Sequence, residues 1–250
     1  VQVQGADSGT SQFSIAMNSK AFRVLSDTLY QDKIGSLVRE ISTNAYDGHI
    51  MAGNVSEPFE IHLPDNFKPW FAVRDFGVGL SPESVRQVFT TYFMSTKDQS
   101  NDTVGAFGLG AKTPFAYTDQ FTIESNYSGV KTIYSAFIDG NGIPNIAEMY
   151  SGETTDRTGV EIKVAVKNED FHNFKNAVAN QLRFFQVKPL VKNCEYFQFA
   201  EVTKVNEQSI VGTDYVVTPF RSELIVIQGQ IGYIVDRNKI ATSKLVQSNP

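Results

Sequence analysis

Four strand-like stretches follow one another closely between residues 120 and 166, and they constrain the fold of this chain more than any other feature. Each stretch alternates polar and apolar residues and contains β-branched side chains, which is typical of half-buried strands. Turn-forming residues separate them at Gly129, at 139–142 and at 156–158. The stretches, in order, are QFTIESNY, VKTIYSAFI, IPNIAEMY and GVEIKVAV. The sequence therefore predicts a sheet built largely from consecutive strands.

Helices are expected mainly before this block. Apolar residues recur at helical spacing over 33–52 and form one stripe. The run Ser81-Pro82-Glu83 is typical of a helix start, and this helix is expected to reach about Phe93. Further helices are expected at 20–30, at 107–116 and from a cap at Asp170 to about Phe185, and short strands at 58–63 and 70–75. Because helices and consecutive strands are segregated along the chain, the expected class is α+β, with one layer of each.

The composition describes a globular protein and sets the expected domain division. The chain has 250 residues, of which 41% are hydrophobic and 20% charged, enough for a sizeable core. Lys188-Pro189 looks like a boundary. We therefore predict one domain over 1–189 and, over 190–250, the start of a following β-rich segment that is truncated here.

Composition also argues against several classes of function. With 22 Lys and Arg against 27 Asp and Glu, the formal charge is −5, which disfavours a dedicated nucleic-acid-binding protein. The single cysteine, Cys194, excludes an intrachain disulfide and a four-thiolate metal site. No apolar run approaches the roughly 20 residues of a membrane span. His49, His62 and His172 show no metal-ligand spacing, so we expect them at the surface or in packing.

Three short motifs carry the candidate chemistry, and the first lies on the helix at 33–52. Glu40, Asn44 and Asp47 fall within about 60° of one another on that helix, beside its apolar stripe. The alternative reading of such a trio is a solvated helix face. Asparagine is a mediocre helix former, so its place in mid-helix favours a polar role.

The second motif is Asp75-Phe-Gly77-Val-Gly79, between a strand and a helix start. Two glycines allow the backbone to approach a ligand closely or to take a positive φ. The aspartate at the strand end can accept a hydrogen bond from a base amino group. An ordinary strand-to-helix turn is the alternative.

The third motif contains Gly105, Gly108 and Gly110, followed by Lys112, at the start of a helix. Backbone N–H groups at such a start can bind an anion. The glycine order differs from the dinucleotide pattern G-x-G-x-x-G, and Ala111 breaks the P-loop register. A glycine-rich hinge is the alternative. The polar stretch 94–106 before it is expected to be a loop.

In this order, E-x-x-x-N-x-x-D, D-x-G-x-G, a polar loop and G-x-x-G-x-G resemble the GHKL ATPase superfamily. That superfamily includes the gyrase B subunit, MutL, ninety-kilodalton heat-shock chaperones and sensor histidine kinases. The resemblance covers roughly residues 15–165. It implies a two-layer α/β sandwich in which a mixed, mostly antiparallel sheet carries its helices on one face, and it implies Mg²⁺ and ATP as cofactors.

The resemblance also implies a role for each motif residue. Glu40 would be the general base for the attacking water, Asn44 would coordinate Mg²⁺, and Asp47 would lie near the nucleoside. Asp75 would accept a hydrogen bond from the adenine amino group. Close access to the nucleotide or contact with its phosphates would come from Gly77, Gly79, Gly105, Gly108, Gly110, Lys112 and Lys97, the last in a lid over 94–106. The family usually has Gly-Thr before the strand behind the adenine, whereas this chain has Thr158-Gly159, so Thr158 would act from a shifted position.

A closer likeness is to the rIIA family of phage lysis-inhibition proteins. It rests on VREISTNAYDGH, FAVRDFGVGLS, GAFGLGAKTPFAYTDQFTI and ELIVIQGQIGYIVDRN. The GHKL resemblance implies slow ATP hydrolysis coupled to lid closure and an ATP-dependent homodimer, and the rIIA likeness implies a second phage lysis-control protein as a partner. It places the protein in the cytoplasm of the infected host, with a peripheral membrane location as an alternative. Two other functions stay open: a nucleotide-sensing scaffold without hydrolysis, and the ATPase half of a DNA-handling enzyme.

Overall fold

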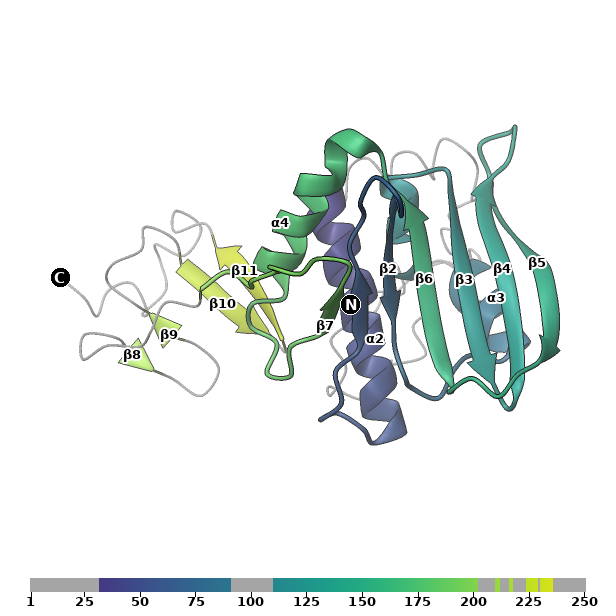
Figure 1. Cartoon of the computed structure of the whole chain (residues 1–250), viewed down its shortest axis with the longest axis horizontal. Coiled ribbons are helices and arrows are strands. Elements are labelled where there is room, and N and C mark those ends of the chain that lie inside the picture. Colours follow the sequence, from purple (N-terminus) through teal and green to yellow (C-terminus); the bar gives the residue numbers. More distant parts are fainter. Residues whose placement is uncertain are drawn as a thin grey trace, which may run out of the picture.

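The computed structural model describes residues 32–90 and 110–201, together with 210–211, 216–217, 224–228 and 230–235. Seven strands form one sheet in the order β5-β4-β3-β6-β2-β1-β7 (Figure 1). All neighbours pair antiparallel except β1 and β7, which are parallel. The strands are β1 (Glu60–His62), β2 (Trp70–Arg74), β3 (Gln120–Tyr127), β4 (Val130–Ile138), β5 (Pro144–Glu153), β6 (Gly159–Ala165) and β7 (Leu190–Lys192). The expected α+β class with a mixed, mostly antiparallel sheet is confirmed.

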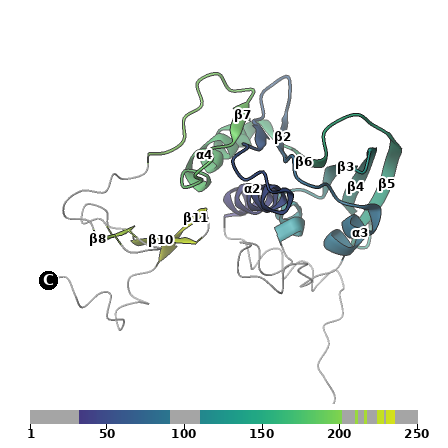
Figure 2. The same ribbon diagram turned by 90° about the horizontal axis from the view of Figure 1, so that it is seen from below.

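The helices form a second layer against this sheet. Figure 2 views the strands end-on, with α2 and α3 on the same side of the sheet. Helix α2 contacts β2, β6 and α4, while the 3₁₀ helix η1 contacts α2 and β3. The helical elements are α2 (Lys33–Ala52), α3 (Pro82–Thr90), η1 (Gly110–Ala116), η2 (Asn168–Asp170) and α4 (Phe171–Gln181). This is the two-layer α/β sandwich expected from the sequence.

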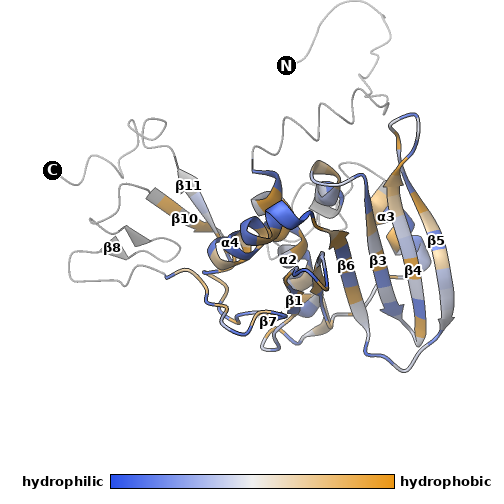
Figure 3. Cartoon of the chain, turned by 45° about the horizontal axis from the view of Figure 1, so that its top comes forward, coloured by the Kyte–Doolittle hydropathy of each residue, from blue (hydrophilic) through white to orange (hydrophobic). Residues whose placement is uncertain are grey.

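Burial alternates along much of β3 and β4, whereas β2 buries three consecutive residues. Apolar and polar colours alternate along β3 and β4 in Figure 3. The core that results is shared by helices and strands, and it contains Leu37, Ile41, Phe71, Val73, Phe121, Ile123, Tyr134, Val164, Phe174 and Val178. Alternation on paired strands places all the inward side chains on one face, which fixes the register of the sheet.

Helix α2 is the central helix, and it has the bounds that the sequence predicted. At its start, Asp32 Oδ1 accepts a hydrogen bond from Gly35 N at 2.8 Å. At its end, Gly53 takes the left-handed conformation with φ of 73°. Ten of its residues are buried, on nearly all sides of the helix. A helix so enclosed has a firmly set rotation and can hold side chains at fixed positions.

Two helical predictions are wrong in detail. The helix expected over 107–116 is a 3₁₀ helix from Gly110 in the described residues, and it contains Pro114, which lacks the N–H of a regular α-helix. Asp170 stands at the N-cap of α4 without a capping hydrogen bond from its side chain. Its carboxylate instead accepts from Tyr117 Oη at 2.9 Å and from Asn173 Nδ2 at 3.0 Å. The helix also ends at Gln181, before Phe185. The predictions for 20–30 and 94–106 lie outside the described residues.

Beyond Pro189 the chain adds β7 to the same sheet. Val191, Cys194, Phe197 and Phe199 then pack against the core. Further along, β10 (Leu224–Gln228) and β11 (Ile231–Val235) form a hairpin, and β8 (Ile210–Val211) pairs with β9 (Val216–Val217). The domain division at 189 and 190 stays a prediction.

The hairpin lies next to the helices. Gln230 Oε1 accepts a hydrogen bond from Gln186 N at 2.7 Å, and Ile231 is buried.

Among the helices in the described part of the chain, none combines the length and the apolar character needed to cross a bilayer.

Candidate functional site

Along one side of α2, three residues at intervals of four form a line. Glu40 and Asn44 are half-buried, and Gly48 continues the same spacing. Because an α-helix rises about 1.5 Å per residue, Asn44 lies about 6 Å and Glu40 about 12 Å from Gly48 along the axis. The neighbouring Asp47 is buried. Glu40 and Asn44 of the first motif therefore lie on an accessible line of α2, whereas Asp47 lies on its buried flank.

Asp75 lies at the Gly48 end of this line. Its side chain is only 7% exposed, directly after β2. Oδ1 accepts hydrogen bonds from Gly77 N at 2.8 Å and from Val160 N at 3.2 Å. Within the described ranges no hydrogen bond reaches Oδ2, so this oxygen is left to accept one from a ligand. Burial raises the pKa of Asp75 to about 6, and the two backbone donors oppose that rise.

Three glycines, which we call the glycine cradle, enclose Asp75: Gly48, Gly77 and Gly159. A Cβ on Gly48 would stand 3.4 Å from the Asp75 carboxylate, and one on Gly77 would stand 2.6 Å from the Gly48 carbonyl oxygen. Gly159 has a φ of 133°, and a Cβ there would collide with the Asp75 carbonyl. Glycine is therefore required at 77 and 159, whereas a Cβ at Gly48 would make only an ordinary van der Waals contact with the carboxylate.

The rest of the turn is bound to β3. Gly79 has a φ of 73°, and its backbone lies against the carbonyl of Asn126. Ser125 is buried, and its Oγ both accepts from Leu80 N and donates to Leu80 O, each at 2.8 Å. Both glycines of the second motif thus lie against backbone atoms of the protein, and Gly79 takes the positive φ that the sequence allowed.

His49 supports the turn from the other side. Its ring Nε2 accepts a hydrogen bond from Phe76 N at 2.8 Å, and Nδ1 donates to Glu57 O at 3.0 Å. These two bonds require the neutral ring with its proton on Nδ1. Burial lowers the pKa of His49, which agrees with a neutral ring. The sequence placed His49 only among surface or packing residues, and it gave no sign of this contact to the turn.

The remaining motif residues lie in different settings. Lys112 is buried, and its Nζ donates to Val88 O of α3 at 2.8 Å. Burial lowers the pKa of Lys112 to about 8. Thr158 is exposed, and the residue after Gly159 is Val160, which has no hydroxyl. Gly110 begins η1, whereas Lys97, Gly105 and Gly108 lie outside the described residues.

The residues present can accommodate Mg²⁺ that also binds phosphate oxygens. Among the residues the structure describes, no group of three or more His, Cys, Asp or Glu could hold a metal on its own. Asn44 offers an amide oxygen, and Glu40 offers a carboxylate one turn away. Mg²⁺ keeps several waters and is usually held by one or two protein oxygens plus phosphates, so this donor set fits.

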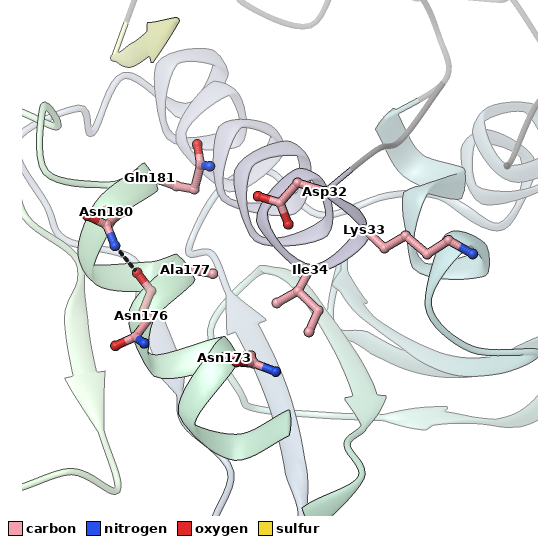
Figure 4. Close-up of a pocket in the computed structure, with 8 residues that line it drawn as sticks. All are labelled: Asp32, Lys33, Ile34, Asn173, Asn176, Ala177, Asn180 and Gln181. Atoms are coloured by element: carbon pink, nitrogen blue, oxygen red, sulfur yellow. Dashed lines mark hydrogen bonds between the residues drawn. The ribbon is translucent and has the colours of Figure 1, made fainter. Parts of the chain in front are cut away.

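A pocket of about 480 Å³ lies elsewhere, between the start of α2 and α4 (Figure 4). Amide side chains of α4 dominate it, and Asn180 Nδ2 donates to the carbonyl of Asn176 at 2.8 Å. Its lining residues are Asp32, Lys33, Ile34, Asn173, Asn176, Ala177, Asn180 and Gln181. None of them belongs to the three motifs.

No family model matches the chain, and no curated protein matches it either. The functional argument therefore depends on the site itself.

Proposed function

We propose that this chain is a Mg²⁺- and ATP-binding module of the GHKL type that hydrolyses ATP slowly. The observation that carries the proposal is the arrangement of Asp75 at one end of the line formed by Glu40, Asn44 and Gly48. A buried carboxylate with one oxygen left to accept, at the end of a line of polar side chains, suits a nucleotide lying along α2.

At the base end, Asp75 Oδ2 would accept a hydrogen bond from the adenine amino group. Oδ1 is held by two backbone donors, so the carboxylate is already oriented. The glycine cradle lets three backbone segments pack directly around Asp75, which restrains the position of its carboxylate before a base binds. Burial excludes water, which strengthens a hydrogen bond to a charged acceptor.

At the other end, Asn44 would contribute an oxygen to Mg²⁺, and the ion would neutralise charge on the phosphates. Glu40 would take the proton from a water that attacks the γ-phosphorus in line, while the bond to the β–γ bridging oxygen breaks and ADP leaves. In the structure, Glu40 Oε1 accepts from Arg39 Nε at 3.2 Å. Glu40 would therefore release or share this partner when it receives the proton.

We extend the proposal to the rIIA-type function. Lid closure by 94–106 would couple the nucleotide state to homodimer formation or to a second phage lysis-control protein, in the host cytoplasm. The acidic net charge of −5 disfavours the DNA-handling alternative, because binding to the DNA backbone depends on basic side chains.

Calorimetry with a non-hydrolysable ATP analogue, with and without Mg²⁺, tests binding. We expect wild type to bind more tightly with Mg²⁺, and Asp75→Asn to lose about 100-fold in affinity, because an amide group in place of Oδ2 cannot accept from the adenine amine. A normal affinity in Asp75→Asn contradicts the adenine assignment.

Single-turnover hydrolysis with Glu40→Ala separates the enzyme from a nucleotide-sensing scaffold. The variant is expected to bind the analogue normally and to lose about 100-fold or more in rate. If wild type and Glu40→Ala bind ATP and are equally inert, the protein is a scaffold. The scaffold is kept as a second candidate because Glu40, the proposed base, is paired with Arg39 in the structure.

A further inference from the structure

A bidentate ion pair joins two loops that lie 100 residues apart in sequence, next to the Asp75 turn. Arg157 Nη1 contacts Glu57 Oε1 at 2.6 Å, and Nη2 contacts Oε2 at 2.8 Å. The Arg157 guanidinium also lies 4.4 Å from the ring centre of Phe76, the residue after Asp75. We call Glu57, Arg157 and the Phe76 ring that Arg157 contacts the base-site latch.

The Arg157 side of the latch continues into the backbone around Asp75. Its carbonyl oxygen accepts from Arg74 Nη2 at 2.6 Å and from Asn126 Nδ2 at 3.3 Å. Two residues further on, Gly159 lies against the Asp75 carbonyl, and then Val160 N donates to the carboxylate. The position of Arg157 therefore fixes the backbone at the start of β6, and this backbone orients Asp75.

The Glu57 side reaches the turn and α2. The Glu57 carbonyl accepts from His49 Nδ1, and Glu57 Oε2 accepts from Asn54 Nδ2 at 3.2 Å. Asn54 Nδ2 also donates to Phe76 O at 3.0 Å. The latch thus connects all three segments that form the glycine cradle.

The chemistry of the pair suits positioning better than stabilisation. Arg157 is 60% exposed, and an exposed ion pair adds little to the free energy of unfolding. The pair fixes the orientation of the two side chains as well as their distance. Two parallel hydrogen bonds and the contact with the Phe76 ring together restrain the plane of the Arg157 guanidinium. Arg157 also lowers the pKa of Glu57 to about 2, so the pair stays charged across the neutral range.

We propose that the base-site latch positions the Asp75 turn and so sets the affinity for the nucleoside part of the nucleotide. This inference rests on the proposed function. Glu57 and Arg157 are positioning residues that act through Asp75 and the glycine cradle. The latch lies at the Asp75 end of the site, so its loss weakens binding of adenosine and of an ATP analogue by the same factor.

Calorimetry with adenosine and with a non-hydrolysable ATP analogue tests the latch. Arg157→Ala and Glu57→Gln are each expected to bind both ligands about 3- to 10-fold more weakly. The exchanged pair Glu57→Arg with Arg157→Glu restores part of that loss. Lys192→Ala, which removes an exposed ion pair with Glu60 in the same sheet, leaves both affinities unchanged. Equal affinities in wild type and Arg157→Ala overturn the proposal, and so does a loss confined to the ATP analogue.

Amide hydrogen exchange gives a readout that needs no nucleotide. The amides of Gly77 and Val160 both donate to Asp75 Oδ1, and Arg157→Ala is expected to speed their exchange several-fold. Unchanged exchange at both amides overturns the latch. If wild type binds neither adenosine nor the analogue, the proposed function fails, and the exchange measurement still decides whether the latch positions the turn.

Discussion

The two ends of the candidate site along α2 are built in opposite ways. At the Asp75 end the side chain is 7% exposed and is held by backbone amides. At the Glu40 end the side chains of Arg39 and Glu40 are 23% and 26% exposed and contact each other. The first end is fixed by backbone atoms, and the second consists of long side chains with access to solvent.

This difference matches two different tasks. Recognition of a flat, rigid base benefits from a site whose geometry is set before binding, because less ordering is then needed. A group that takes up a proton from water must instead exchange partners during the reaction. In the proposed function these tasks would lie about 12 Å apart along one helix, the length of eight residues of α-helix.

The fixed end also carries a cost in stability. The pKa of Asp75, about 6, lies about two above its ordinary value of 3.8, which corresponds to about 3 kcal/mol disfavouring the charged form in the folded state. A buried charge retained at such a cost is more typical of functional sites than of packing.

The largest effect is expected from filling the glycine cradle. Gly159→Ala places a Cβ against the Asp75 carbonyl at a φ of 133°, so we expect a loss of about 3 to 5 kcal/mol in the free energy of unfolding. Gly129→Ala is the matched control, because Gly129 has a φ of 76° with no atom within 4 Å of the added Cβ. Its expected cost is about 1 kcal/mol. Denaturant unfolding compares the two, and equal costs would mean that close packing around Asp75 is absent.

A smaller effect, of opposite sign, is expected from Asp75→Asn. Asparagine keeps the acceptor for Gly77 N and Val160 N and removes the buried charge, so the variant is more stable by about 2 to 3 kcal/mol at pH 8. Because the pKa of Asp75 is higher in the folded state than in the unfolded state, the wild type becomes less stable as pH rises from about 4 to about 6, while the variant does not. The advantage of the variant is therefore absent below about pH 4 and complete above about pH 7.

Unfolding curves at several pH values measure that difference. A constant difference between Asp75→Asn and wild type from pH 4 to pH 8 would show that Asp75 does not titrate abnormally. Combined with the loss of nucleotide affinity, the expected gain in stability separates a binding role for Asp75 from a structural one.

Much of the fold was accessible from local patterns. Helix α2 has the predicted bounds because a capping aspartate and a terminal glycine enclose its apolar stripe. Strands β3 and β4 also have the predicted bounds, since each alternates and ends at a turn residue. Asp170 lies at the predicted N-cap position, but its side chain makes no capping hydrogen bond, because Asn173 and Tyr117, the latter distant in sequence, take up its carboxylate. A local pattern cannot reveal such a competitor.

The site was accessible only in part, for the same reason. The spacing of Glu40, Asn44 and Asp47 predicted one polar edge of α2, of which Asp47 is buried. The glycines at 77 and 79 predicted close approach to a ligand or a positive φ, and Gly79 has a positive φ. Gly48 joins Asp75 only through tertiary contact, and nothing in its immediate neighbours marks it. The sequence marked Gly159 only beside Thr158, and its contact with the Asp75 carbonyl is likewise tertiary. Arg157 and Glu57 are likewise paired across 100 residues, so the base-site latch required the three-dimensional structure.

The smallest effect is expected at the exposed end, from Arg39→Ala. The Arg39–Glu40 pair is partly exposed, so its loss should change the free energy of unfolding by less than about 0.5 kcal/mol. The Arg39 guanidinium also lies 5.8 Å from the Tyr233 ring centre of β11, and Tyr233→Phe, which keeps that ring, is the matched control. Without Arg39, Glu40 has no hydrogen-bond partner to release before it takes a proton, and we expect single-turnover hydrolysis to rise by about 2- to 5-fold while nucleotide affinity stays constant. A loss of stability as large as that of Gly159→Ala would mean that both ends of the site are equally rigid, and the contrast between them would fail.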